Sequence, residues 1–321
     1  ERATLVHRVG DRIAERIYDF AAWQTYEAGK NWAEAEADVA EAIDFCRYYA
    51  HQALAMDKPV PVSEFPGETN ESWLQPVGAG VVIPPWNFPL AILVGMTLGP
   101  VAAGNTVVLK PASTTPMIGW GFMQVLAEAG VPDGVVNFLP GPGSRVGDTL
   151  VDDPRTRFIN FTGSKEVGLR IAERAAKVHD GQKWMKRAYM EMGGKDALII
   201  DETADLDAAA ADAVRSAFGF QGQKCSACSR LIVVDAVHDE VVSKVMSMAG
   251  ALTVGSPTDN HPIGPVISED QFDSILDEID RGTSEATLVL GGRPVPLEGG
   301  FYIEPTIFAD VVADQRLAQH E

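Results

Sequence analysis

The sequence predicts an α/β fold in which a Rossmann-like, parallel-sheet domain is followed by a second α/β domain. Short β-rich segments alternate with helical segments four times between residues 78 and 179. A second alternation begins after Gly193 and Gly194. The chain has 321 residues, of which 46% are hydrophobic, so it can form two packed cores. We therefore expect two domains, at 1–192 and 193–321.

The segments before this alternation are expected to be mainly helical. Residues 1–55 have helical character, and residues 39–50 repeat apolar side chains at helical spacing. Cys46 lies on that apolar face, and we expect it to be a core residue because free cysteines are commonly buried. Residues 56–77 are rich in proline and partly alternating, which predicts an extended hairpin that leaves the main body.

Four strand–helix units form the centre of the expected first domain. Strands that alternate with helices pair in parallel through crossover connections. Ligands of such sheets bind beyond the carboxyl ends of the strands, so the residues that follow each strand are candidate site residues. The expected strands are 78–83, 105–110, 134–139 and 156–161, and the helices that follow them are 89–103, 115–130, 143–152 and 165–179.

The expected second domain repeats the same rhythm around a cysteine-containing loop. A strand at 196–201 precedes a helix at 205–220. The loop follows, and a strand at 230–234 then leads into a helix at 237–250.

The composition excludes several classes of partner. Lys and Arg total 26 against 45 Asp and Glu, and the net charge of −19 disfavours nucleic acids and anionic membrane surfaces. No apolar run reaches the roughly 20 residues that a membrane span needs. Three cysteines do not make a disulfide framework, so we expect a reducing, cytoplasmic setting.

Polar residues follow the first two expected strands. Asn87 lies between prolines in PPWNFP, and its side-chain amide can either donate to an oxyanion or bond its own backbone in a turn. Lys110 follows the second strand, where its ammonium either reaches a ribose or phosphate group or is simply solvated.

Glycines and a helix start follow the next two strands. GPGSRVG, which ends at Gly147, resembles a dinucleotide glycine pattern with one residue too many. Gly163 and Ser164 lead directly into a helix whose N-terminus either binds a phosphate or is an ordinary cap. All four features lie at strand ends of one sheet, and this coincidence indicates a dinucleotide site.

The domain boundary and the cysteine loop contain the reactive candidates. Glu191 precedes two glycines and is either a general base or an exposed carboxylate. Cys225 and Cys228 lie three apart, without a nearby histidine. A metal site needs about four ligands, and a redox CxxC usually opens a helix, so a single nucleophile at Cys225 fits better. Lys224 places a cation beside that thiol, while Cys228 runs into an apolar strand.

Five motifs together resemble the NAD(P)-dependent aldehyde dehydrogenase family. PPWNFP, LKPAS, NFTGSKEVG, EMGGKD and GQKCSA occur in the order and spacing of that family, and the resemblance covers essentially the whole chain. The stretches HDGQKWMKRAYMEMGGKDALIIDETADLD and AFGFQGQKCSACSRL are similar to the branch that oxidises L-glutamate γ-semialdehyde, formed from 1-pyrroline-5-carboxylate, to L-glutamate. The alternatives to this function are another semialdehyde dehydrogenase of the same family and a catalytically silent fragment.

The resemblance implies roles for the matching positions. Cys225 is implied as the nucleophile, Glu191 as the general base, and Asn87 as an oxyanion donor beside the Cys225 backbone N–H. The implied cofactor-binding residues are Ile83, Trp86, Lys110, Ser113, Gly143, Gly147, Gly163, Ser164, Val167 and Glu321. The implied substrate contacts are Glu41, Phe88 and Ser226. No metal is implied.

The resemblance also implies NAD as cofactor, a small-molecule aldehyde as substrate, and a homo-oligomer. Ser113 stands where many NAD-specific relatives carry Glu, whose carboxylate repels a 2′-phosphate, so NADP is possible as well. The chain begins in helical register without Met and stops at Glu321, so we expect a fragment truncated at both ends.

Overall fold

The computed structural model describes residues 1–321 and divides into two compact units. The first unit comprises Glu1–Glu27 and Glu36–Met192. The second comprises Ala28–Ala35 and Gly193–Glu321.

One segment departs from the expected division at residues 192 and 193. Residues 28–35, expected in the first domain, belong to the second unit. The Asn31 side chain donates to the carbonyl of His261, and the Trp32 N–H donates to Asn260 Oδ1 at 3.0 Å. These long-range bonds have no local sequence signature, because they join residues about 230 positions apart.

The first unit contains the predicted Rossmann-like parallel sheet. Its strands run in the order β3-β2-β1-β4-β5, and every neighbouring pair is parallel. The strands are β1 (Ala79–Ile83), β2 (Thr106–Leu109), β3 (Val136–Phe138), β4 (Phe158–Thr162) and β5 (Arg187–Glu191). Four were expected within two residues. The fifth has mostly exposed side chains at the edge of the sheet, so it lacks the apolar run that marks the others.

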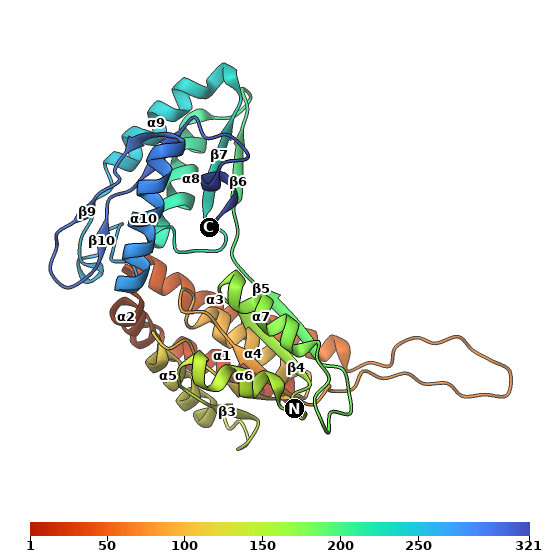
Figure 1. Ribbon diagram of the computed structural model, residues 1–321. Coiled ribbons are helices and arrows are strands. Elements are labelled where there is room, and N and C mark those ends of the chain that lie inside the picture. The colour runs from red at the N-terminus through yellow and green to blue at the C-terminus, as the bar shows by residue number, and fades with distance from the viewer. The chain divides into compact units, whose positions relative to one another are not determined.

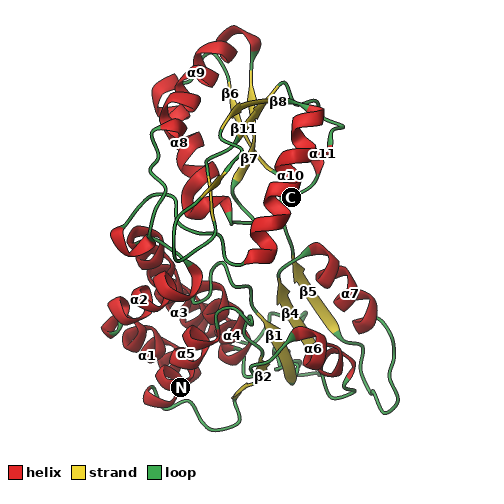
Figure 2. Ribbon diagram, turned by 60° about the vertical axis from the view of Figure 1, so that its left-hand side comes forward, coloured by secondary structure: helices red, strands yellow, loops and turns green.

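Helices cover both faces of this sheet, as Figure 2 shows. One face packs against the N-terminal helices and α4 and α5, and the other packs against α6 and α7. Burial on both faces explains why the inner strands are mostly apolar. The helices are α1 (Arg2–Glu15), α2 (Ile17–Ala28), α3 (Trp32–Met56), α4 (Ala91–Ala102), α5 (Pro116–Glu128), α6 (Gly143–Asp152) and α7 (Lys165–Ala175).

Two sequence expectations about the N-terminal region have different outcomes. Cys46 is fully buried in the core, as predicted, and burial raises the pKa of its thiol to about 12. Residues 57–77 leave the first unit as a long loop (Figure 1), but only one antiparallel bridge, between Val60 and Ser72, joins its two arms. The hairpin forms no regular strands because its apolar residues, such as Phe65, are exposed. A two-stranded hairpin is stable only when it packs against another layer of structure.

The second unit is built on the parallel pair β6 (Asp196–Ile200) and β7 (Cys228–Val233). Their apolar residues share a core with α8 (Leu206–Phe218) and α9 (His238–Gly250). Elements after residue 250 were not expected from the sequence. They are α10 (Glu269–Glu285), β8 (Thr287–Leu290), β9 (Pro294–Val295), β10 (Tyr302–Ile303), β11 (Ile307–Ala309) and α11 (Arg316–Gln319).

Short 3-10 turns connect several of these elements. The turn η1 (Gly219–Gly222) follows α8, η2 (Asp235–Val237) precedes α9, and η3 (Pro257–Asp259) lies between α9 and α10. None of the helices in either unit combines the length and hydropathy required to cross a membrane.

A glycine in the central strand gives a test of this packing. A Cβ at Gly80 would lie 2.1–2.4 Å from ring atoms of Phe158 on the neighbouring strand. Gly80→Ala therefore forces the ring to move, and we expect it to lower the free energy of unfolding by about 1–3 kcal/mol. Urea denaturation followed by circular dichroism measures this change. Gly147→Ala is the control, because no neighbouring atom lies within 4 Å of its Cβ position; equal stability of the two variants contradicts the prediction.

Candidate active site

The loops that follow the parallel strands meet at the carboxyl edge of the first unit's sheet. Strand β1 ends at Ile83, and the turn that contains Trp86, Asn87 and Phe88 follows at once. The Asn87 Oδ1 accepts a hydrogen bond from the Phe88 N–H at 3.1 Å. This bond matches the interpretation of Asn87 as a residue that bonds backbone within its own turn. It uses the amide oxygen and does not involve the donor atom Nδ2.

A buried carboxylate fixes the start of the helix after this turn. Asp38 of α3 is only 2% exposed, and its two oxygens accept from the backbone N–H groups of Leu90 and Ala91 at 3.4 and 3.2 Å. A negative charge at a helix N-terminus is stabilising because it pairs with otherwise unsatisfied N–H groups. Asp38 thereby holds the start of α4, and with it the end of the Asn87 turn, against α3.

Lys110 is neither solvated nor extended away from the sheet edge. Its side chain is buried, and its Nζ donates to the carbonyl of Pro111 at 2.7 Å. Burial lowers the pKa of this ammonium. The Ser113 hydroxyl lies 3.5 Å from the carbonyl of Gly141, which joins the loops after β2 and β3.

The N-terminal turn of α6 offers room for a ligand. A Cβ at Gly143 would lie 3.9 Å from Lys110 Cε, and one at Gly147 would meet nothing within 4 Å. Neither glycine has a positive φ, so neither backbone conformation nor protein packing requires glycine here. These residues lie in the first two turns of a helix at the carboxyl edge of the sheet, a position at which parallel-sheet proteins bind phosphate groups.

Residues after β4 and β5 lie side by side at the same edge. The Gly163 N–H donates to the carbonyl of Glu191 at 3.1 Å. Ser164 caps α7, and its hydroxyl accepts from the Val167 N–H at 3.5 Å. Val167 itself is 43% exposed on the first turn of the helix.

Ion pairs join α6 to α7. Arg170 binds Asp148 through two nitrogens, and Arg174 binds Asp152 in the same bidentate manner. The acidic and basic residues both repeat at four-residue spacing, so the two helices are joined over one full turn. The helix that carries Gly147 and the one that carries Val167 are thereby held at a fixed separation.

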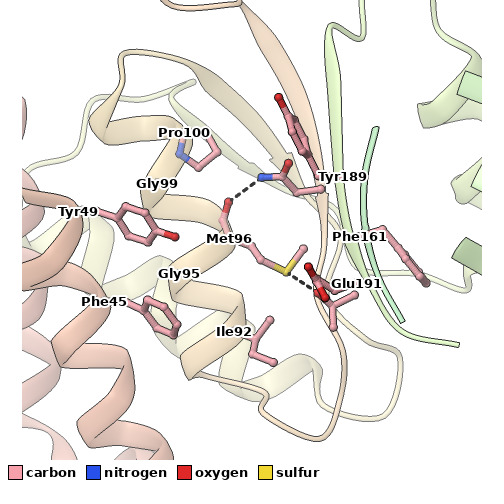
Figure 3. A pocket seen from close by; sticks show the side chains of 12 residues that line it. Phe45, Tyr49, Ile92, Gly95, Met96, Gly99, Pro100, Phe161, Tyr189 and Glu191 are labelled. Carbon is pink, nitrogen blue, oxygen red and sulfur yellow. Dashed lines mark hydrogen bonds between the residues drawn. The ribbon is translucent and has the colours of Figure 1, made fainter. Parts of the chain in front are cut away.

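Glu191 faces a pocket of ≈ 420 Å³ within the first unit. Figure 3 shows Phe45 and Tyr49 on one side of this pocket and Tyr189 and Glu191 on the opposite side. The lining is mostly apolar, and it comes from α3, α4, β4 and β5: Phe45, Tyr49, Ile92, Gly95, Met96, Gly99, Pro100, Asn160, Phe161, Thr162, Tyr189 and Glu191.

Two glycines of α4 form the floor under the aromatic side. A Cβ at Gly95 would lie 3.1 Å from the Phe45 ring, and one at Gly99 would lie 3.1 Å from the Tyr49 ring. The two rings are nearly parallel, with centroids 6.0 Å apart. The sequence analysis did not predict this aromatic side of the pocket. The aromatic residues of α3 and the glycines of α4 are both four residues apart, and such matched spacing indicates that two helices approach closely.

Two implied substrate contacts of the first unit do not line this pocket. Glu41 lies one turn before Phe45 on α3, where it is exposed. Phe88 is half-buried in the turn after β1. The pocket wall is formed instead by later residues of α3 and by residues of α4, the helix that follows the Phe88 turn.

In the second unit, Cys225 follows a strained turn. Phe220 and Gln221 have φ of 50° and 57°, in the left-handed region that disfavours side chains, and Gly222 continues there at 69°. Such conformations cost about 1–3 kcal/mol each and occur where the surrounding structure enforces them. Cys225 is half-buried after this turn, and Ser226 beside it is exposed.

The charges around Cys225 disfavour the thiolate. Burial raises the pKa of the Cys225 thiol, and the nearby Glu321 carboxylate raises it further, while the backbone N–H groups of Cys225 and Ser226 oppose the shift. Burial also raises the pKa of Glu321, against the opposing effect of Lys195.

The Gly193–Gly194 pair lies directly under these groups. A Cβ at Gly193 would overlap Glu321 Oε2, at 1.3 Å, and one at Gly194 would lie 2.7 Å from the Cys225 carbonyl oxygen. Only glycine permits this approach, so the sequence EMGGKD brings the segment before β6 against both Cys225 and Glu321.

Cys228 has different surroundings from Cys225. It begins β7, and its Sγ lies 3.6 Å from the Arg230 carbonyl. Both cysteines are free, and no group of three His, Cys, Asp or Glu side chains is arranged to hold a metal ion.

The expected cation beside Cys225 is neutralised. Lys224 Nζ lies 2.8 Å from a carboxylate oxygen of Glu34. The interpretation of Lys224 as a charge that acts on the thiol was therefore wrong, because the long-range partner Glu34 could not be read from the local sequence.

Comparisons with known proteins agree with this geometry. The Aldehyde dehydrogenase family matches residues 1–321. The chain is 52% identical, over its full length, to 1-pyrroline-5-carboxylate dehydrogenase from Geobacillus kaustophilus, of which it spans 62%. A solved structure of 1-pyrroline-5-carboxylate dehydrogenase from Thermus with bound NAD superposes on the whole chain with a TM-score of 0.98 at 52% identity, over 62% of that protein.

A longer protein also contains a similar region. Proline utilization A from Bdellovibrio bacteriovorus superposes on the whole chain with a TM-score of 0.96 at 47% identity, and the match covers 33% of it. The family match over all residues, together with identities of about half, identifies the chain as a member of the aldehyde dehydrogenase family.

Proposed function

We propose that this chain provides the cofactor-binding and nucleophile-bearing parts of an enzyme that oxidises L-glutamate γ-semialdehyde to L-glutamate with NAD. The observation that carries the proposal is the 52% identity, over the entire chain, to 1-pyrroline-5-carboxylate dehydrogenase. The chain spans about 62% of that relative's length, so the activity is proposed for the protein that contains it.

The carboxyl edge of the first unit is proposed to bind the cofactor. Gly143 and Gly147 leave space for the diphosphate at the start of α6. Ser113 and the buried Lys110 lie at the adjacent strand end, where the adenosine ribose is proposed to bind. The exposed Val167, at the start of α7, offers an apolar surface for the adenine ring. When bound, NAD supplies the acceptor for the hydride.

Ile83, Trp86 and Gly163 are proposed to complete this surface, since each lies at or just beyond a strand end of the same sheet. Glu321 is proposed to contact the nicotinamide ribose from the second unit. Ser113 carries no charge, so the proposed site does not exclude the 2′-phosphate of NADP by repulsion.

The proposed chemistry begins with the Cys225 sulfur. Its thiolate attacks the aldehyde carbon, and the backbone N–H of Cys225 and the amide of Asn87 stabilise the oxyanion that forms. Departure of hydride leaves a thioester on Cys225. Glu191 then takes a proton from water, which attacks the thioester and releases the carboxylic acid and the thiol.

Local surroundings support these roles. Burial and the Glu321 carboxylate raise the pKa of the Cys225 thiol, and the backbone N–H groups of Cys225 and Ser226 act in the opposite direction, toward the thiolate. The Glu191 carboxylate is exposed at the apolar pocket, so it remains open to water and substrate. The pocket is proposed to accept the carbon chain of the substrate. Glu41, Phe88 and Ser226, which are not part of its lining, are proposed as further substrate contacts. A homo-oligomer is proposed for the protein, by analogy with the family.

The two cysteines of the loop provide the decisive test. Cys225→Ala removes the proposed nucleophile, and we expect NADH formation, followed at 340 nm, to fall by at least about 1,000-fold. Cys228→Ala should retain activity within about threefold, because its sulfur packs against the Arg230 carbonyl in β7. Turnover in Cys225→Ala excludes the proposal, and equal losses in both variants favour a dithiol. A panel of semialdehydes of different length tests the substrate.

Gly147 tests the cofactor site without turnover. Gly147→Ala places a methyl group in the open space beside α6, and we expect the dissociation constant for NAD to rise at least about tenfold. Stability should not fall, because Gly→Ala inside a helix contributes about 0.5–1 kcal/mol. Titration calorimetry with NAD measures the change.

The matched control for this variant is Thr149→Ala. Thr149 is exposed on the same helix. It should leave NAD affinity unchanged, and unchanged affinity in Gly147→Ala argues against the assigned diphosphate position.

A further inference from the structure

Residues Ala28–Ala35 form a strap that belongs to the second unit. The strap comprises the last residue of α2, the connection 29–31 and the first turn of α3. The strap is tied to the residues after α9 by the bonds from Asn31 and Trp32. Its Gly29 carbonyl lies 2.8 Å from the Cβ position of Gly264, so the two backbones are in close contact. The strap is therefore an integral part of this unit.

One charged residue of the strap is completely buried against the strained turn. Lys30 has no exposed surface, and its Nζ lies 4.9 Å from the centroid of the Phe220 ring. A desolvated cation over an aromatic face is attracted by the negative face of the ring. Phe220 is itself 1% exposed and is the first residue of the turn with a left-handed backbone. Lys30 thus holds the entry to the turn.

A second charged residue of the strap holds the exit. Glu34 and Lys224 form an ion pair whose side chains are 21% and 20% exposed. The pair packs directly on backbone, because a Cβ at Gly219 would lie 2.8 Å from Glu34 Oε1 and 3.2 Å from Lys224 Nζ. Lys224 is bonded covalently to Cys225, so the position of this ammonium restrains the backbone of the reactive residue.

We propose that the strap is a positioning element for Cys225, in which Lys30 and Glu34 hold Phe220 and Lys224, the two ends of the strained turn. The proposal rests on the assignment of Cys225 as nucleophile. Two consecutive non-glycine residues with left-handed backbone conformations are strained, and they keep these conformations only where neighbouring groups hold them in place. The strap supplies these groups from a distant part of the chain.

The ion pair also balances the charge of Lys224, the residue that precedes Cys225 in the chain. The other charged groups near Cys225 in the second unit are Glu321 and Asp196, with Lys195 and Arg230 beside them. Paired with Glu34, Lys224 adds no net charge to this group. Without its partner, either member leaves one unpaired charge in this part of the second unit.

A double-mutant cycle tests the proposal. Glu34→Gln leaves the Lys224 ammonium unpaired, which favours the thiolate, so the pH profile of Cys225 alkylation by iodoacetamide should shift to lower pH. Lys224→Met leaves the Glu34 carboxylate unpaired, and the profile should shift to higher pH. The double variant should return to the parent profile. Mass spectrometry of the peptide that contains Cys225 measures the alkylation rate.

Turnover provides the second reading. All three variants lose the anchor at the exit of the turn, so we expect kcat to fall about tenfold in each, including the double variant whose alkylation profile is restored. Asp207→Asn is the control, because Asp207 pairs with Lys244 on the face formed by α8 and α9. It should change neither reading.

Opposite shifts that cancel in the double variant support the proposal. Shifts in the same direction, or an unchanged profile together with parental kcat, overturn it. If Glu34→Gln does not fold, Lys224→Met alone carries the test, and an unshifted profile overturns the proposal. Alkylation needs no substrate or cofactor, so it reports on the strap even if Cys225→Ala retains turnover and the proposed function fails.

Discussion

The parallel arrangement of five strands is the constraint from which the site in the first unit follows. Because every neighbouring pair is parallel, the five carboxyl ends meet at one edge. The residues at or soon after these strand ends include Asn87, Lys110, Gly143, Ser164 and Glu191. An antiparallel sheet would send alternate turns to the opposite edge. Residues more than a hundred positions apart therefore share one surface without any direct bond between most of them.

Close backbone contact has the corresponding role in the second unit. The absence of side chains at Gly193 and Gly194 lets the segment before β6 lie against Cys225 and Glu321. The turn before Cys225 is held in a left-handed conformation that costs free energy. Both features indicate that the placement of one sulfur is maintained against the local preference of the chain, and rigid placement of a nucleophile is what covalent catalysis requires.

Buried charges contact backbone groups or an aromatic ring in both units. Asp38 satisfies two N–H groups at the start of α4, Lys110 donates to the carbonyl of Pro111, and Lys30 lies over Phe220. A buried charge is unfavourable unless it is paired or hydrogen-bonded, so each of these residues is tied to its place. Each adjoins a turn that carries a candidate site residue, and this association explains why charged side chains are found within these cores.

The sequence by itself determined the strand–helix alternation, the parallel sheet and the resemblance to the family. These follow from the spacing of apolar residues, the positions of glycines and the order of short motifs, all of which can be read along the chain without knowledge of long-range contacts. Local pattern did not reveal β5, whose exposed residues form a strand only by pairing with β4. It also misassigned residues 28–35 and the charge of Lys224. Those outcomes depend on partners such as Asn260 and Glu34, whose contact free energies exist only after the chain has folded. The tertiary structure alone decided them, since long-range contacts leave no period in the sequence.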